Sequence, residues 1–322
     1  MIYLDHAATT PVPRPVADAM YQVLTEQFGN PSSQYPLGRE AKALVEEGRA
    51  VVAGALGCRP ENLHFTSCGT ESDNWAFTAA LWQNRRGGKH TVPPPPAVGR
   101  GRHTGRHIIT TAVEHSAVLE PCKLLQQQGY EVTYLAPDKT GHVTAEQVAQ
   151  ALREDTVLVS MMLVNNENGC RLPVENVFRM VKRNDPEIIT HCDAVQGFLK
   201  IPFKPRTLCA DLVSVSGHKV HALKGVGALY IRHGVRVKPI LCGSEQERGL
   251  RPGTESVPLI ASFGAATEKL SLNIEKRLER VSQLRSSLIA KLREMDGVII
   301  RDIEGASPYV LNISLLCYRS EI

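Results

Sequence analysis

The sequence predicts an α/β fold in which helices cover a mostly parallel, seven-stranded sheet, followed by a smaller α+β domain. Short apolar runs, which suit buried strands, alternate with longer amphipathic stretches, which suit helices. From residue 257 this alternation gives way to a long helical stretch and short strands. We therefore expect a large domain at 13–254, and a small domain formed by 1–12 together with 255–322.

The first third of the chain predicts an extended arm at 1–12, where Pro11 interrupts regular structure. Helical patterns follow at 15–27 and 37–56, and Gly57 closes the second. Residues 29–33 have the composition of a loop, and a strand at 63–66 precedes a helix at 70–83. Residues 87–106 have no apolar periodicity and contain a run of prolines, so we expect an insertion loop there.

Regular alternation resumes after that loop. Strands are expected at 107–111, 131–135, 156–164, 187–192, 211–215 and 227–232. Helices at 116–128 and 174–183 separate some of them, and Thr144 with Gln147 has the spacing of a capping box that opens another helix. The last part of the chain predicts a helical stretch from 257 to about 292, then strands at 298–301 and 310–315.

Composition excludes several classes of protein. The net charge of +4 is mild and no basic stripe is present, which argues against nucleic acid as a partner. No segment has the apolar length of a membrane span, and the N-terminus lacks the pattern of a signal peptide. The eight cysteines form no C-x-x-C pair, which argues against a metal site or disulfide framework. We expect a cytoplasmic protein with neither metal nor membrane partner.

Polar stretches follow the predicted strands, at the sheet edge where open α/β folds bind ligands. One of them opens a helix with small residues, whose N–H groups and dipole suit an anion. Another is a carboxylate at a buried strand end, which needs a cationic partner. The candidates, in chain order, are Gly69, Thr70, His115, Asn166, Asp193, Gln196, Ser216, His218 and Lys219.

Each candidate has an ordinary structural explanation when taken alone. Thr70 is a normal helix cap, Asn166 a normal turn residue, and most lysines like Lys219 are solvated. Their combination favours chemistry, because a lysine past a buried strand can be a nucleophilic amine. An amine for a Schiff base, Asp193 for a pyridinium, an anion cradle and His115 to stack on a ring match the needs of pyridoxal 5'-phosphate (PLP).

The motifs also resemble a known family. The sequence is similar to the cysteine desulfurase / selenocysteine lyase group of class V, fold-type I PLP-dependent enzymes. The matching stretches, in family order, are 3–11, 29–33, 65–72, 113–115, 165–167, 191–196, 216–219 and 248–254. Among them are Ser216-Gly-His-Lys219 and Arg248-Gly-Leu-Arg-Pro-Gly-Thr254, so the resemblance extends from residue 3 to about 254.

The resemblance implies a role for the residues around the cofactor ring. Lys219 would form the Schiff base and later move a proton, and His115 would stack on the ring. Asp193 would pair with the ring nitrogen, while Gln196 and Asn166 would reach the region of the ring hydroxyl.

A second set of residues would hold the cofactor's phosphate. By resemblance these are Gly69, Thr70, Ser216 and His218. Thr254 would reach the phosphate of the neighbouring subunit, which implies a homodimer with shared sites.

The function that the resemblance implies is conversion of L-cysteine to L-alanine, with sulfur passed to an iron–sulfur scaffold or another acceptor. One alternative is a selenocysteine lyase, and another is a truncated PLP-binding protein without desulfurase activity. The family's sulfur-accepting cysteine and a later carboxylate-binding arginine are expected beyond Ile322, so slow sulfide release is expected of this chain. We expect Cys317 to be a strand-end or buried thiol with no part in sulfur transfer.

Overall fold

A seven-stranded sheet is the centre of the computed structural model, which describes residues 2–83, 105–139 and 141–318. Its strand order is β1-β7-β6-β5-β4-β2-β3. The strands are β1 (Leu63–Thr66), β2 (His107–Thr111), β3 (Glu131–Leu135), β4 (Thr156–Ser160), β5 (Ile189–Asp193), β6 (Leu212–Ser216) and β7 (Gly227–Ile231). Only the pairs that involve β7 are antiparallel among these described strands. The predicted seven-stranded, mostly parallel sheet is confirmed.

The two faces of the sheet pack into separate hydrophobic cores because side chains alternate along a strand. Ile108, Leu158 and Leu212 belong to one core, whereas Ile109 and Val159, the next residues along their strands, belong to the other. Continuous apolar runs are typical of such doubly covered strands. This explains why the strands were detectable in the sequence.

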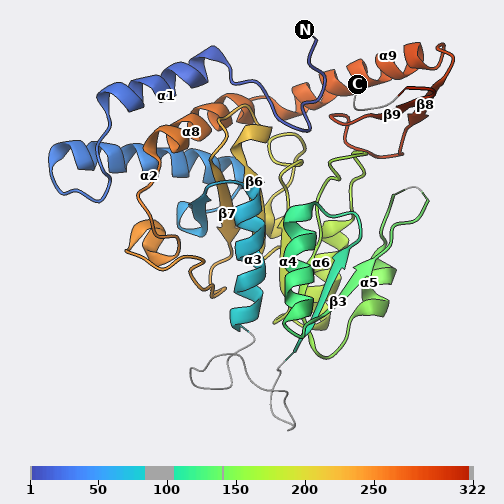
Figure 1. Cartoon of the computed structure of the whole chain (residues 1–322), viewed down its shortest axis with the longest axis horizontal. Coiled ribbons are helices and arrows are strands. Elements are labelled where there is room, and N and C mark those ends of the chain that lie inside the picture. The colour runs from blue at the N-terminus through green and yellow to red at the C-terminus, as the bar shows by residue number, and fades with distance from the viewer. Residues whose placement is uncertain (1, 84–104, 140, 319–322) are drawn as a thin grey trace.

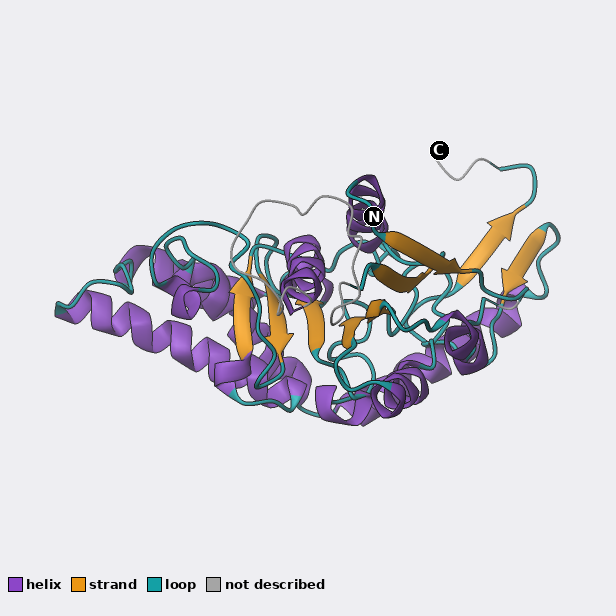
Figure 2. Cartoon of the chain, turned by 90° about the horizontal axis from the view of Figure 1, so that it is seen from below, coloured by secondary structure: helices purple, strands orange, loops and turns teal. Residues whose placement is uncertain are grey.

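Helices cover both faces (Figures 1 and 2). On one face α3 (Gly69–Gln83) crosses the strands and packs beside α4 (Ser116–Gln127). The other core takes in α1 (Arg14–Glu26), α2 (Pro36–Leu56), α5 (Ala145–Ala151), α6 (Val174–Asn184) and α7 (Pro205–Leu208). The predicted capping box at Thr144 and Gln147 is present. No helix in the described ranges has the length and apolar character needed to cross a bilayer.

The C-terminal part differs from its prediction at one point. The helical stretch after 257 is two helices, α8 (Val257–Ser271) and α9 (Ile274–Leu292), because Asn273 adopts a left-handed conformation with φ 64°. A two-stranded antiparallel sheet of β8 (Val298–Arg301) and β9 (Asn312–Leu315) follows. It lies beside the end of α9, away from the seven-stranded sheet (Figure 1).

Helix α8 packs on α2 and shares the core of the large sheet. The two helices approach closely at paired glycines: a Cβ added to Gly264 would lie 3.1 Å from Gly48 Cα. The expected domain division, 13–254 against 1–12 plus 255–322, stays a prediction. Most of the expected insertion loop, from 87 to 104, lies outside the described residues.

Strand β4 is shorter than expected, ending at Ser160 where the apolar run predicted a strand to residue 164. The backbone N–H of Met162 donates to the carboxyl of Glu114 at 2.9 Å, so a side chain replaces a neighbouring strand as acceptor. Apolar character alone does not distinguish such a buried loop from a strand.

A buried ion pair fastens a distant loop to the first strand. Arg49 on α2 donates from both terminal nitrogens to Glu247, at 2.7 and 2.8 Å, and both side chains are almost fully buried. The same carboxylate accepts the N–H of Phe65 on β1 at 3.0 Å. Glu247 and its neighbour Arg248 have φ angles of 48° and 60°, an unfavourable backbone that these contacts stabilise.

Replacing Arg49 with Met should therefore lower the free energy of unfolding by about 3–5 kcal/mol, because the Glu247 carboxylate would stay buried without its cation. Urea unfolding followed by circular dichroism measures the change. Arg14→Met is the matched control: its ion pair with Asp18 is exposed and worth about 0–1 kcal/mol. Equal, small effects of the two substitutions would contradict this interpretation.

Candidate active site

Lys219 lies one short turn past β6, in the 3₁₀ helix Gly217–Lys219. Its Nζ donates to the carbonyl oxygens of Ala7 at 2.5 Å and Ala8 at 2.9 Å. Burial lowers the pKa of this amine, against the opposing charges of Asp5 and Asp193. The lysine is thus partly buried, with its amine held by two backbone carbonyls.

The N-terminal arm packs against the segment that carries Lys219. Thr10 donates its N–H and its hydroxyl to the carbonyl of His218, at 3.0 and 2.8 Å. The N–H of His221 returns a hydrogen bond to Thr10 Oγ1 at 2.7 Å, and Thr9 Oγ1 lies 3.2 Å from His218 Nδ1. The arm's role at the site was not predicted, although 3–11 is one of the motifs that match the family. These contacts are invisible in the sequence because they join residues more than 200 positions apart.

Asp193 and Gln196 lie at the end of the neighbouring strand, β5. Gln196 Nε2 donates to Ala7 O at 2.9 Å, so Gln196 and Lys219 meet at the same carbonyl. The Asp193 carboxyl accepts the N–H of Val195 at 2.9 Å. In the described ranges no cation forms an ion pair with it. Burial, and then the charge of Asp73, raises the pKa of Asp193 to about 7.

A buried polar cluster that sequence reasoning missed lies around Asp193. His191, two residues earlier on β5, is within 2.8 Å of Ser160 Oγ, 3.0 Å of Ser214 Oγ and 3.5 Å of Asp73 Oδ1. Burial raises the pKa of Asp73 to about 7 and lowers that of His191 to about 4. The motif at 191–196 contained His191, but nothing in the sequence marked Asp73, which lies in the middle of a helical pattern.

Glu114 is a further buried carboxyl of this region. It accepts hydrogen bonds from Thr111 Oγ1 at 2.8 Å and from Met162 N at 2.9 Å. Burial raises its pKa to about 8, with smaller contributions from the charges of Asp193 and Asp73. The site therefore holds several carboxyl groups whose ionisation burial disfavours.

An anion cradle lies where α3 begins. A Cβ on Gly69 would lie 2.9 Å from Val195 Cγ2 and 3.4 Å from Ser216 Cβ, so the backbone there is open only because the residue is glycine. Ser216 Oγ is buried without a hydrogen-bond partner in the described chain. The first N–H groups of a helix also lack partners within it, which makes its start a site for an anion. Thr70, the next residue, is exposed at the same helix start.

Three further predicted site residues make their contacts elsewhere in the described chain. His115 is exposed, and its Nδ1 accepts the N–H of Ala117 at 3.1 Å as the cap of α4. Its charge nevertheless acts on Asp193. Asn166 Nδ2 donates to Glu167 at 2.6 Å. Thr254 is exposed on a different segment.

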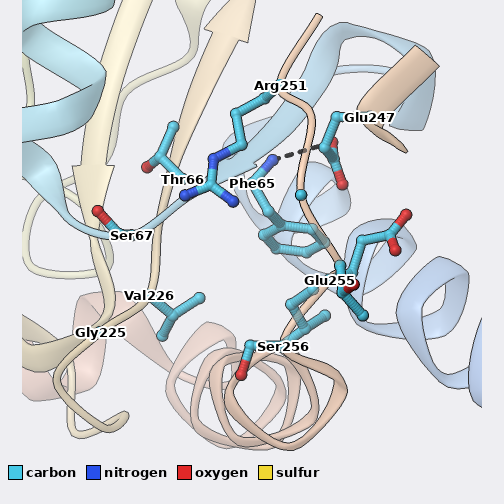
Figure 3. Close-up of a pocket in the computed structure, with 12 residues that line it drawn as sticks. Phe65, Thr66, Ser67, Gly225, Val226, Glu247, Arg251, Glu255 and Ser256 are labelled. Atoms are coloured by element: carbon cyan, nitrogen blue, oxygen red, sulfur yellow. Dashed lines mark hydrogen bonds between the residues drawn. The ribbon is translucent and has the colours of Figure 1, made fainter. Parts of the chain in front are cut away.

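Thr254 lines a cavity of about 90 Å³ between the end of β1, Gly225–Val226 and the loop after Glu247 (Figure 3). Arg251 in this loop donates to both carboxylate oxygens of Glu71, at 2.8 and 3.1 Å. Glu71 also accepts the N–H of Ser67 at 2.8 Å. The loop is thus tied to the first turn of α3, which forms the anion cradle.

These groups fit PLP. The orphan hydroxyl of Ser216 and the glycine-lined start of α3 suit a phosphate, and the unpaired carboxyl of Asp193 suits a protonated ring nitrogen. Lys219 supplies an amine close to both strand ends. Within the described residues no cluster of three or more His, Cys, Asp or Glu side chains could hold a metal ion.

Cys317 and Cys192 lie in contrasting environments. Cys317 follows β9, as expected of a strand-end residue, and it is exposed, with φ 67°. Cys192 is fully buried on β5, and burial raises the pKa of its thiol.

Comparison with known proteins agrees with this geometry. The sequence matches the family described as Aminotransferase class-V over residues 2–93 and 95–320. The chain belongs to the class V aminotransferase family. The expected resemblance and the fold-type I architecture of this class V family member are both confirmed.

Named relatives of this class V chain match most of its length. It is 43% identical over 291 residues to a cysteine desulfurase IscS of Methanosarcina thermophila, covering 90% of this chain and 67% of the relative. A cysteine desulfurase of Nostoc sp. is 41% identical, with 97% and 74% covered. A solved structure of a NifS-like protein superposes with a TM-score of 0.89 at 39% identity, covering 98% of this chain and 81% of that one.

The unpaired Asp193 predicts a pH dependence for the cofactor-free protein. Its raised pKa means that the folded state binds more protons than the unfolded state between about pH 4 and 7. This carboxyl's contribution to stability therefore falls as the pH rises through that range, by at most about 1.4 kcal/mol per pH unit. Relative to the wild type, Asp193→Asn should become more stable as the pH rises from 5 to 8.

Urea unfolding of both cofactor-free proteins at several pH values measures this difference. Asp18→Asn is the control, since Asp18 is exposed and forms only a surface ion pair. A stability difference between wild type and Asp193→Asn that does not change with pH would show that Asp193 has an ordinary pKa.

Proposed function

We propose that this chain is a PLP-dependent cysteine desulfurase, which converts L-cysteine to L-alanine and passes the sulfur to an acceptor. The proposal rests on one observation: Lys219 and Gln196 both donate hydrogen bonds to the same carbonyl of the N-terminal arm, and the unpaired Asp193 lies on the neighbouring strand. The family membership and the two relatives named cysteine desulfurase support the same activity.

PLP, when bound, supplies an electron sink that stabilises negative charge at the substrate's α-carbon. This chain's residues would hold it at each end. Gly69, Thr70, Ser216 and His218 would bind the phosphate, with the helix dipole of α3 favouring the anion. Asp193 would keep the ring nitrogen protonated, and His115 would pack on the ring face.

Lys219 would attach the cofactor and move protons at the substrate. A lowered pKa leaves more of the amine neutral at physiological pH, and the neutral form is the nucleophile. Two backbone carbonyls, of Ala7 and Ala8, fix the direction of its Nζ. Gln196 and Asn166 would donate hydrogen bonds near the ring hydroxyl.

The first test is chemical. Borohydride reduction of the PLP-loaded protein, followed by peptide mapping, should place the pyridoxyl group on Lys219. Lys219→Ala should retain cofactor only by non-covalent contacts and lose it on gel filtration. Lys224→Ala, the same change at an exposed lysine five residues along, should behave as the wild type. A pyridoxyl group mapped to another lysine would refute the site.

Activity is tested by following alanine and sulfide from L-cysteine in a single-turnover experiment, with dithiothreitol present to reduce the transferred sulfur to sulfide. Slow formation of alanine in step with sulfide, absent in Lys219→Ala, is the expected outcome. Relative rates on cysteine and selenocysteine measure substrate preference. PLP bound at Lys219 with alanine formed from neither substrate would refute desulfurase and lyase activity while leaving the cofactor site intact.

We also propose a homodimer in which Thr254 serves the partner's site. Thr254 is exposed, on a loop that the Arg49–Glu247 and Arg251–Glu71 ion pairs hold firmly, so it is placed to reach a second copy. Light scattering at micromolar concentration should give twice the chain mass of 35.3 kDa. A monomer that is still saturated with PLP would contradict shared sites. The acceptor of sulfur, by family resemblance an iron–sulfur scaffold, is part of the same proposal.

A further inference from the structure

Lys200 is a second buried lysine beside the proposed cofactor site. Its exposed fraction is 8%, and its Nζ donates to Gln196 Oε1 at 2.7 Å. Lysines are almost never buried unless they are paired. None of the described carboxylates forms an ion pair with Lys200. Its hydrogen-bond acceptor is instead the neutral amide of Gln196.

Three hydrogen bonds join Lys200 to Lys219. Gln196 Nε2 donates to Ala7 O, and that oxygen also accepts from Lys219 Nζ. A carbonyl oxygen only accepts, so the amide nitrogen of Gln196 must face Ala7. Its Oε1 is therefore left for Lys200, and the amide has one allowed orientation.

The backbone around Lys200 is held in an unusual conformation. Leu199, the residue before it, has φ 57°, which is unfavourable for a side chain branched beyond Cβ. The carbonyl of Leu199 accepts from Arg277 on α9 at 2.9 Å, which supports the turn from outside. Such strained positions persist where surrounding structure fixes them, and they cluster at functional sites.

We propose that Lys200 is a positioning residue for the cofactor site: it fixes the Gln196 amide so that Nε2 and, through Ala7, the amine of Lys219 are correctly aimed. This inference rests on the proposed PLP site. A purely structural role would be met better by an apolar side chain, because burial of the amine is unfavourable. Burial, then the charge of Lys219, lowers the pKa of Lys200 to about 7, in agreement with the closeness of the two amines.

The test is a double-mutant cycle on the full-length protein, with Lys200→Met, Gln196→Ala and the double variant. The readouts are the rate of PLP release into a phosphatase trap and the absorption maximum of the bound cofactor. Loss of a buried hydrogen bond should make release about tenfold faster in Lys200→Met and shift the absorption maximum. The double variant should release PLP no faster than Gln196→Ala, because Lys200 acts through Gln196.

Lys204→Met is the matched control, since Lys204 is exposed four residues further along the same segment. It should leave both readouts unchanged. If Lys200→Met does not fold, Lys200→Gln takes its place in the cycle, with a shorter side chain that loses the contact with Gln196. Additive effects in the double variant, or an unchanged release rate in the single one, would refute the positioning role. A wild type that binds no PLP at Lys219 would refute the proposed site instead.

Discussion

The burial of Asp193 without a cation is the constraint on which the site depends. Asp193, the last residue of β5, lies near the hydrogen-bonded pair Ser160–His191 and near two further buried carboxyls, Asp73 and Glu114. Ionising any one of them disfavours the others, so the cluster is unsatisfied until a positive group enters. A protonated ring nitrogen of the proposed cofactor would meet that need. The sheet places the anion cradle at a nearby strand end, where it would hold the phosphate of the same cofactor.

The N-terminal arm completes the site by a different means. Its carbonyls accept hydrogen bonds from groups that can only donate, the amine of Lys219 and the amide nitrogen of Gln196. Because backbone carbonyls carry no full charge, they orient an amine without raising its pKa as a carboxylate would. An amine held in this way stays oriented while burial keeps part of it neutral. The arm thus combines rigidity with reactivity, which a salt bridge at the same place would not provide.

The sequence predicted most features that depend on neighbouring residues, and it missed those that depend on contacts between distant parts of the chain. The strands were found because both of their faces are buried, and Gly69, Asp193 and Ser216 were found because strand ends meet at one edge. One error has a distant cause and the other a local one. The distant Glu114 takes the N–H of Met162 just past β4, and the left-handed backbone of Asn273 divides the last helical stretch. The contacts of the arm and of Lys200 depend on folded geometry, and no periodicity in the sequence encodes them.

The loop at 246–254 shows how the fold supports a strained segment near its own site. Consecutive left-handed residues at Glu247 and Arg248 would be unstable in an isolated loop. The bidentate contact with Arg49 opposes that strain because releasing the loop would leave the buried Arg49 with only the half-exposed Glu46 as a carboxylate partner. Further along, Arg251 ties the loop to Glu71 at the start of α3. Thr254 follows three residues after this second anchor, so a ligand bound in the cradle and a group contacting Thr254 would share the support of the same helix.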